Sequence, residues 1–297
     1  MLALGALGVS VSGLEISNLL GFRRAAVYLE WRAICCPARD LGPCVKTLAV
    51  IPARLGASRL PRKPLRLIGG VPLVVRVWEH VSAMRVADQV VVATDSDEIA
   101  QALRHSDATV ALTSDAHPSG TDRVAEVAAQ RRYVGFDAVV NVQGDEPFVS
   151  DAAVRGAAEV VTSGRFPLGT AAAPAPDDVL ARPHVVKVVT ADDGRALYFS
   201  RAPIPWLREP EDAPVRDRVA RQHIGVYAYT RDALASWVAL PQHPLERIER
   251  LEQLRPLAAG YAMGVAAVSE LPIGGVDTEE DLARANARWL ELSAERA

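Results

Sequence analysis

Cysteine is nearly missing from this sequence of 297 residues. Its three cysteines, Cys35, Cys36 and Cys44, all precede the first run that is predicted to be a strand, and they include neither a CxxC pair nor a histidine at ligand spacing. This pattern predicts neither a zinc site nor a disulfide framework. The cysteine-free remainder suits a reducing compartment, so we expect a cytoplasmic protein.

An excess of charge of either sign is missing too, since 23% of the residues are charged and the net charge is −3. Without a strong field, we expect neither nucleic acid nor a membrane surface as a partner, and any site for anions must be local. Lysine is scarce beside arginine, and each of the three lysines, Lys46, Lys63 and Lys187, is therefore a candidate for a specific role.

The first 45 residues lack the features of a targeting segment. They contain apolar patches such as LALGALGVSVSGL, but no basic start, no sustained apolar span and no small-residue cleavage pattern. They predict neither a signal peptide nor a membrane helix. We expect residues 1–45 to be a dispensable amino-terminal extension, and residues 46–297 to form a single catalytic domain.

From Thr47 onward, β-branched runs alternate with amphipathic stretches. Strands are predicted at TLAVIPA (47–53), DQVVVATD (88–95), ATVALTS (108–114) and FDAVVNVQGDEP (136–147), and helices over 72–85, 96–106, 119–132 and 150–162. This βαβ order predicts an α/β fold with a doubly wound, mostly parallel sheet.

The second half of the chain is less regular. A hairpin is predicted over 184–206 with its turn at Asp193 and Gly194, followed by strands over 223–230 and 261–270 and helices over 231–238, 244–258 and 278–292. The stretches 174–183 and 209–217 are predicted to be loops. We therefore expect an inserted β-rich lobe at about 184–230 within the single domain.

The loop after the first strand, PARLGASRLPRKP, collects positive charge. Arg54, Arg59 and Lys63 stand at the carboxyl end of that strand, where open α/β sheets bind ligands, and Gly56 would let the backbone approach a phosphate. Neither a Walker nor a Rossmann glycine pattern occurs. A triphosphate site is one interpretation, and a solvated basic loop is the other.

Two carboxylates, Asp145 and Glu146, follow the strand that ends in NVQG. Magnesium takes one or two carboxylates together with phosphate oxygens, so a metal site beside a triphosphate is possible here. Asp277 in the segment GGVDTEEDL is a candidate second ligand, although Asp277 or Thr278 is also expected to cap the final helix.

Eight ordered motifs resemble one family. They are PARLGASRLPRKPL, VVVATDSDEIA, SDAHPSGTDRVAEVA, VVNVQGDEPFV, VVKVVTADDGRALYFSRAPIPW, QHIGVYAYTRDAL, LERIERLEQLR and GVDTEEDLARA. The chain is similar over about 47–285 to CMP-KDO synthetases, the 3-deoxy-manno-octulosonate cytidylyltransferases. The resemblance implies a Rossmann-like nucleotidyltransferase fold, and an enzyme that transfers CMP from CTP to the anomeric hydroxyl of a sugar acid in lipopolysaccharide biosynthesis.

The resemblance also implies roles for particular residues. It implies triphosphate binding by Arg54, Arg59 and Lys63; cytidine contacts by His117, Ser119 and Gly120; Mg²⁺ as cofactor on Asp145 and Asp277; catalytic roles for Arg59, Lys63, Asp145 and Asp277; and a sugar-acid pocket lined by Gln143, Arg201, His223, Tyr227, Glu252 and Gln253. Arg201 suits the carboxylate of the acid, and the others suit hydroxyls. A homodimer built through the β-rich lobe is implied as well.

Several alternatives stay open at this stage. Tyr227 can be a core residue, Glu252 and Gln253 can lie on a helix surface, and Arg201 can pair with the aspartates near the hairpin turn. The acceptor can be another acidic sugar or a small phosphonate, and the chain can also be a CTP-binding protein without catalysis.

The sequence departs from the family pattern at Arg62, where glycine is usual, and at Pro118, where a polar residue is common. These two substitutions affect the backbone of the phosphate loop and of the nucleotide-facing loop.

Overall fold

The computed structural model describes residues 45–56 and 59–295. The expected amino-terminal extension, residues 1–45, lies outside the described residues except for Val45.

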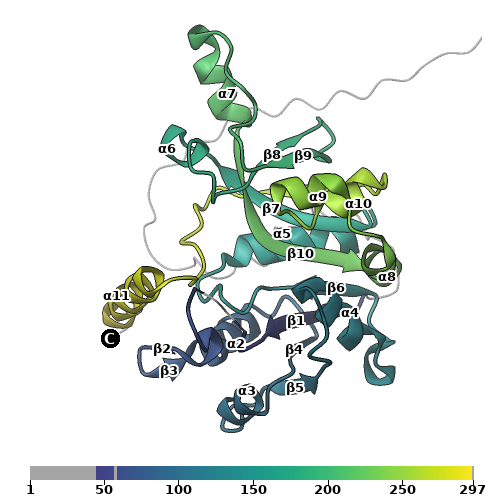
Figure 1. The fold of residues 1–297 in the computed structure, drawn as a ribbon, viewed down its shortest axis with the longest axis vertical. Helices are drawn as coiled ribbons and strands as arrows, with labels where there is room; N and C mark the ends of the chain where they lie inside the picture. The colour runs from purple at the N-terminus through teal and green to yellow at the C-terminus, as the bar shows by residue number, and fades with distance from the viewer. Residues whose placement is uncertain (1–44, 57–58, 296–297) are drawn as a thin grey trace, which may run out of the picture. The chain divides into compact units, whose positions relative to one another are not determined.

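Nine strands of the described residues form one sheet, in the order β11-β7-β10-β6-β1-β4-β5, with β8 and β9 attached beside β10 (Figure 1). The strands are β1 (Thr47–Ala53), β4 (Gln89–Thr94), β5 (Thr109–Leu112), β6 (Ala138–Asn141), β7 (Leu168–Pro174), β8 (Lys187–Thr190), β9 (Ala196–Ser200), β10 (Arg221–Thr230) and β11 (Met263–Ala267). The four strands β6, β1, β4 and β5 are parallel, which confirms the predicted βαβ half.

Helices cover both faces of this sheet, as the doubly wound prediction requires. The helices are α2 (Leu73–Met84), α3 (Asp97–Ala102), α4 (Gly120–Ala129), α5 (Asp151–Thr162), α6 (Asp177–Leu180), α7 (Ala213–Val219), α8 (Arg231–Ala239), α9 (Pro244–Glu249), α10 (Leu254–Ala258) and α11 (Glu279–Glu295), with short 3-10 turns η1 (Lys63–Leu65), η2 (Arg131–Tyr133) and η3 (Pro210–Asp212). Helices α2, α3, α5 and α11 pack on side chains such as Ile51 and Val140, whereas α4, α8 and α10 pack on side chains such as Val50 and Val139. Because adjacent strand residues point to opposite faces, each strand contributes to two separate cores.

Strand β7 was not predicted from the sequence, although it lies inside the sheet. Its sequence LGTAAAP is rich in alanine and glycine, which have low strand propensity, yet six of its seven residues are buried. Gly169 explains part of this composition, because a Cβ atom there would lie 2.4 Å from the carbonyl oxygen of Ala157 in α5. The small residues of β7 therefore let α5 pack closely against the sheet.

Strand β10 connects the β-rich lobe to the main sheet. It runs antiparallel to both β6 and β7, and its first residues, Arg221 and Gln222, also pair with β8. The predicted hairpin is confirmed as β8 and β9, with Gly194 in its turn at φ 84°. The loop predictions were wrong in part: 174–183 contains α6, and 209–217 contains η3 and most of α7.

The single helix predicted over 244–258 is also wrong. It is two helices, α9 and α10, because Arg250 adopts a left-handed conformation with φ 56° and ends α9. Residues Leu251, Glu252 and Gln253 follow as an irregular connection. The break turns Glu252 toward α4, where it contacts Ser119.

The carboxyl-terminal helix α11 packs against the short hairpin of β2 (Leu67–Ile68) and β3 (Val71–Pro72). The Asn286 side chain accepts from the Gly69 amide at 3.0 Å and donates to the Leu67 carbonyl at 3.0 Å. The Arg76 guanidinium lies 3.7 Å from the centre of the Trp289 ring. Among the described residues, no helix is both long enough and apolar enough to cross a membrane.

Candidate active site

A pocket of about 310 Å³ opens at the carboxyl ends of β1 and β6. Eight of the residues predicted for the site line it: Arg54, Arg59, Lys63, Ser119, Gly120, Gln143, Asp145 and Asp277. They come from the loop after β1, the start of α4, the loop after β6 and the segment before α11. This is the position at which open parallel sheets bind ligands.

At this pocket the end of β1 packs closely against the loop after β6 and against the start of α4. A Cβ atom on Gly144 would lie 2.5 Å from the carbonyl oxygen of Pro52. A Cβ on Gly120 would lie 3.4 Å from the Pro52 ring. Glycine at position 144 is therefore required for the ends of β1 and β6 to approach each other at this distance.

Lys63 joins the two acidic residues of the pocket. Its ammonium donates to Asp145 Oδ2 at 2.5 Å and to Asp277 Oδ1 at 2.9 Å. Burial lowers the pKa of Lys63, but the two carboxylates outweigh burial and raise the pKa above its usual value. Two carboxylates that come from distant parts of the chain thus converge on one cationic position.

Asp277 is free for this contact because another residue caps α11. The Thr278 hydroxyl accepts from the Asp281 amide at 3.2 Å, and Asp281 Oδ2 in turn accepts from the backbone amides of Asp277 and Thr278. The side chain of Asp277 instead accepts from Lys63 and from Arg59, the latter at 2.9 Å. Of the two alternatives from the sequence, the structure makes Thr278 the cap.

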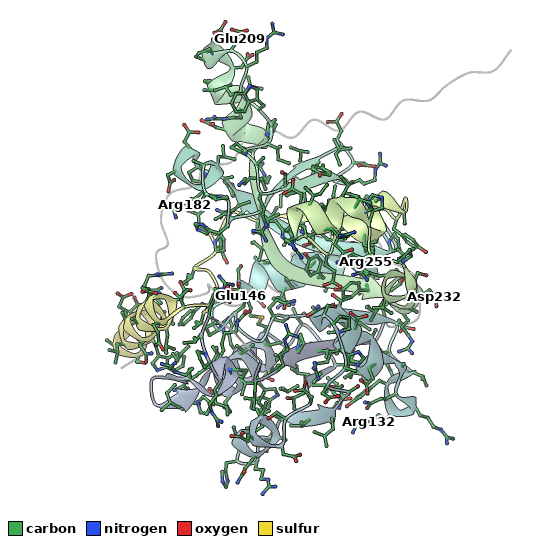
Figure 2. All side chains as sticks on the ribbon, in the orientation of Figure 1. Arg132, Glu146, Arg182, Glu209, Asp232 and Arg255 are labelled. Carbon is green, nitrogen blue, oxygen red and sulfur yellow. The ribbon has the colours of Figure 1, made fainter. Side chains whose placement is uncertain are left out.

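Glu146 adds a third carboxyl group behind the pair, and Figure 2 shows it beside the segment that leads into α11. A Cβ on Gly275 in that segment would lie 3.0 Å from Glu146 Oε1. Burial, together with the nearby charges of Asp145 and Asp277, raises the pKa of Glu146 to about 8. Glu146 therefore holds its proton more strongly than an exposed glutamate does.

The phosphate loop also contains a strained position. Arg62, where the family usually has glycine, adopts φ 56°, a conformation that glycine reaches without steric cost. Its guanidinium pairs with Glu98 at the start of α3. The loop thus keeps a glycine-like backbone although the side chain has changed.

Arg123 was missed by the sequence analysis, although it also lines the pocket. It is 2% exposed and donates to Asp95 Oδ2 at 2.7 Å and to the Thr113 hydroxyl. Asp95 follows β4 and Thr113 follows β5, so the pair fixes α4 against two strand ends. The sequence did contain one signal for Arg123: it stands beside Val124 on the apolar face of a predicted helix, where an arginine is unusual.

Two aromatic side chains of β10 form a wall beside the pocket. The rings of His223 and Tyr227 lie 5.3 Å apart, and His223 also packs edge-on against Phe199 at 5.1 Å. Gln143, which lines the pocket, lies next to Gly225 of β10, where a Cβ atom would be 3.9 Å from Cγ of Gln143. Gln143 therefore connects this wall to the pocket. Burial raises the pKa of Tyr227 well above its usual value, so Tyr227 keeps a hydroxyl hydrogen to donate.

Glu252 and Gln253 lie in the connection between α9 and α10. Ser119, the cap of α4, donates to Glu252 Oε1 at 3.0 Å. Burial raises the pKa of Glu252, and the hydrogen bond from Ser119 opposes that shift. Gln253 is 3% exposed at the start of α10. Glu252 is therefore joined to the start of α4, and neither residue lies on an exposed helix surface.

Six of the residues predicted for the site do not line the pocket: His117, Arg201, His223, Tyr227, Glu252 and Gln253. The Arg201 guanidinium donates to the carbonyls of Glu249, Arg250 and Pro183 at 2.8, 3.4 and 3.2 Å, not to an aspartate of the hairpin turn. Three of its five N–H groups are used in this way, which leaves two. His117 instead contacts Glu126 of α4 through Nε2.

Lys187 is fully buried beneath Arg201. Its ammonium donates to the carbonyls of Arg182 at 3.0 Å and Val185 at 2.8 Å, and to that of Arg201. Burial lowers the pKa of Lys187. This scarce lysine fixes the backbone that carries Arg201, and sequence alone did not indicate that role.

Fold and pocket together define the class of protein. A cationic loop follows the first strand of a doubly wound sheet, two carboxylates converge beside it, and the wall of His223 and Tyr227 adjoins the pocket through Gln143. This arrangement can hold a nucleoside triphosphate and a second, hydroxyl-bearing substrate. The chain is a nucleotidyltransferase.

Comparison with known proteins identifies the family. The family model described as Cytidylyltransferase matches residues 48–265. A 3-deoxy-manno-octulosonate cytidylyltransferase of Gemmatimonas aurantiaca is 62% identical over 247 residues, which cover 83% of this chain and 95% of the relative. That of Leptothrix cholodnii is 44% identical over 253 residues, covering 82% and 91%. The solved structure of a CMP:2-keto-3-deoxy-manno-octonic acid synthetase complexed with CTP is 36% identical, with a TM-score of 0.76, and the match covers 83% of this chain and 99% of that one.

The chain belongs to the cytidylyltransferase family, and within it to the 3-deoxy-manno-octulosonate cytidylyltransferases. The resemblance described from the sequence is confirmed, and so is the Rossmann-like nucleotidyltransferase fold.

Proposed function

We propose that this enzyme transfers CMP from CTP to the anomeric hydroxyl of 3-deoxy-manno-octulosonate (KDO), giving CMP-KDO and pyrophosphate for lipopolysaccharide biosynthesis. The observation that carries the proposal is the convergence of Lys63, Asp145 and Asp277 in one pocket next to the wall formed by His223 and Tyr227. The relatives that match most of the chain are named for the same reaction.

In this reaction the hydroxyl oxygen attacks the α-phosphorus in line with the leaving group, a new P–O bond forms as the bond to pyrophosphate breaks, and the hydroxyl proton is released. No protein nucleophile is required. Arg54, Arg59 and Lys63 neutralise the triphosphate, and Arg59 and Lys63 stabilise the charge that accumulates on the pyrophosphate. Ser119 and Gly120 supply the start of α4, where the nucleoside is expected to bind.

Asp145 and Asp277 fit a divalent cation, for which we propose Mg²⁺. No group of three or more histidine, cysteine, aspartate or glutamate side chains suited to a metal occurs among the described residues. Two carboxylates that converge on one point, here the Lys63 ammonium, are nevertheless sufficient for Mg²⁺, because Mg²⁺ takes its remaining ligands from phosphate and water. When bound, such a cation neutralises the triphosphate and favours deprotonation of the attacking hydroxyl.

The sugar acid is proposed to bind along the wall beside the pocket. Gln143, His223, Tyr227 and Glu252 offer hydrogen bonds to its hydroxyls, and we propose that Gln253, which is buried beside Glu252 in the chain, contributes to the same pocket. The two N–H groups that Arg201 keeps after binding backbone carbonyls are available for the carboxylate. His117 would act on the cytidine loop through Glu126 rather than by direct contact.

Release of pyrophosphate from CTP tests the proposal against a panel of sugar acids and small phosphonates. We expect release that depends on KDO and on a divalent cation, with CMP-KDO detected as the product. Release with a different acid would redirect the acceptor assignment, and no release with any acceptor would contradict transfer itself.

We further propose a homodimer that forms through the arm between β9 and β10. Figure 1 shows α7 extending away from the sheet on this arm. Trp206, Val215 and Val219 on it are 79%, 50% and 51% exposed, which is unusual for apolar side chains clustered on one arm. Light scattering should show a dimer that Trp206→Ser with Val215→Ser dissociates, whereas Val134→Ser, an exposed valine elsewhere, should not. A monomeric wild-type enzyme would contradict the proposal.

The family match begins at residue 48, which supports the proposal that residues 1–45 are dispensable. A chain that begins at Val45 should keep its turnover and solubility, and loss of either would contradict this. The absence of cysteine from the rest of the chain supports a cytoplasmic location.

A further inference from the structure

Thr170 lies at a break in the pairing of β7 and β10, behind the wall formed by His223 and Tyr227. Across from it the register of β10 shifts between Ile224 and Tyr227, so that extra residues bulge out of the strand. Thr170 is fully buried, and its hydroxyl oxygen has three polar neighbours: the carbonyl of Val226 at 2.7 Å, His223 Nε2 at 2.8 Å and the carbonyl of Ile224 at 3.3 Å.

The single hydrogen of this hydroxyl can satisfy one of these neighbours. Carbonyl oxygens only accept, so the hydrogen belongs on the nearest one, that of Val226. If the hydroxyl instead donated to His223 Nε2, two oxygen atoms 2.7 Å apart would face each other in a buried place with no hydrogen between them. The hydroxyl therefore accepts at its lone pair, and His223 Nε2 must carry a hydrogen to donate.

The other ring nitrogen of His223 is then left as an acceptor. Burial lowers the pKa of His223 to about 3, so the ring is neutral at physiological pH and carries one hydrogen. No described residue donates to Nδ1 or accepts from it. Among the described side chains, the fully buried polar atoms without a hydrogen-bond partner are Tyr133 Oη and Trp237 Nε1. Nδ1 of His223 is not one of them.

We propose that Thr170 is a positioning residue, which holds His223 in the tautomer protonated on Nε2 and so presents Nδ1 as a hydrogen-bond acceptor to a hydroxyl of the sugar acid. The inference rests on the proposed function, because it needs the acceptor to bind beside His223. The same hydroxyl donates to the Val226 carbonyl and so restrains the bulge in β10. This restraint fixes the distance between His223 and Tyr227 on the wall. A hydroxyl of the substrate would supply the hydrogen that Nδ1 lacks.

The tautomer can be measured directly in the wild-type enzyme without substrate. Nitrogen NMR of the enzyme labelled in its histidine rings, with the His223 signals assigned by their loss in His223→Gln, should show a protonated Nε2 and an unprotonated Nδ1. A protonated Nδ1, or a doubly protonated ring at neutral pH, would overturn the proposal. Because no turnover is involved, this result stands even if the enzyme uses an acid other than KDO.

Two variants test the consequence for binding. Thr170→Val keeps the shape of the side chain but removes the hydroxyl, and it should raise KM for the sugar acid about tenfold, the value of one hydrogen bond, while KM for CTP stays unchanged. Thr170→Ser restores the hydroxyl and should restore both the KM and the tautomer. In the His223→Gln background, Thr170→Val should add little, because both changes remove the same interaction.

Other outcomes would contradict the inference. If Thr170→Val raised both KM values equally, or added its full effect to that of His223→Gln, Thr170 would act on the fold in general and not through His223. If Thr170→Val did not fold, the tautomer of the wild-type enzyme and the behaviour of Thr170→Ser would still decide. Failure of the wild-type enzyme to use any sugar acid would count against the proposed function and not against the tautomer.

Discussion

Lys63 donates to Asp145 over 2.5 Å, at the centre of the pocket. The same ammonium also lies 2.9 Å from Asp277, so one lysine neutralises two carboxylates before any substrate has bound. Under the proposed mechanism the lysine and a divalent cation favour the same place, so binding of CTP with such a cation would move Lys63 from the carboxylates to the phosphates.

Replacement of Lys63 by methionine should therefore impair the enzyme in two ways. It removes a cation from the developing pyrophosphate and leaves Asp145 and Asp277 to repel each other. We expect kcat/KM for CTP to fall about a hundredfold or more, measured by pyrophosphate release. Lys46→Met is the matched control, because Lys46 is exposed at the start of β1, and its turnover should equal that of the wild type.

Asp277→Asn should reduce turnover while it preserves CTP binding. The change removes one of the two proposed metal ligands, and kcat should fall on the order of a hundredfold. CTP affinity should hold or improve, because Arg59 and Lys63 lose a competing partner. Calorimetry with CTP and pyrophosphate release measure the two effects, and Glu280→Gln, an exposed carboxylate three residues further on in the first turn of α11, is the control. Near-normal turnover in both Asp277→Asn and Asp145→Asn would reject the metal site.

Gly144→Ala should disturb the site without removing a polar group. The new Cβ would lie 2.5 Å from the Pro52 carbonyl oxygen, so one of the two strand ends must move. We expect a loss of about 2 kcal/mol in the free energy of unfolding and a fall in kcat on the order of a hundredfold. Gly135→Ala, where a Cβ meets nothing within 4 Å, should change neither quantity in urea unfolding or turnover assays.

Arg62 allows its backbone strain to be measured separately from its ion pair. Arg62→Gly and Arg62→Ala both remove the contact with Glu98, but glycine adopts φ 56° freely and alanine does not. The glycine variant should be more stable than the alanine variant by about 1 kcal/mol in urea unfolding. Equal stability would mean that position 62 is not left-handed in solution.

His223 should make stability depend on pH. Its pKa is about 3 in the folded enzyme against 6.5 in the unfolded chain, so the stability that it contributes is complete above pH 6.5 and declines as the pH falls toward 3. Between pH 6.5 and 5 the decline should be about 2 kcal/mol. His223→Gln should remove this part of the slope, and the difference between the two proteins isolates His223 because Glu146 and the other titrating groups are common to both.

The sequence was sufficient for the parts of the fold that have strong local signals. The runs at β1, β4 and β6 are apolar and β-branched, and each ends in a polar loop, so both the sheet and the position of the phosphate loop could be predicted. Strand β7 could not, because alanine and glycine in LGTAAAP reflect contact with α5 and not local strand preference. The break at Arg250 was missed for a similar reason, since an arginine gives no local indication of a left-handed conformation.

The site shows the same division. Lys63, Asp145 and Asp277, which the structure brings together in one pocket, could be selected from the sequence because each follows a predicted strand or precedes a predicted helix within a recognisable motif. Arg123 and Thr170 were missed because their roles depend on partners in other elements, Asp95 for the first and His223 for the second. Long-range hydrogen bonds of this kind leave no periodic pattern in a sequence.

The pairing of strand β10 restricts where residues can be inserted into or deleted from this chain. The arm that precedes it ends in a surface helix, where residues can be inserted or deleted with little effect on the sheet. Within β10, by contrast, a single added or lost residue before Tyr227 would turn every following side chain to the opposite face of the sheet. Natural variation in length is therefore expected outside β10, while the strand itself keeps a constant number of residues.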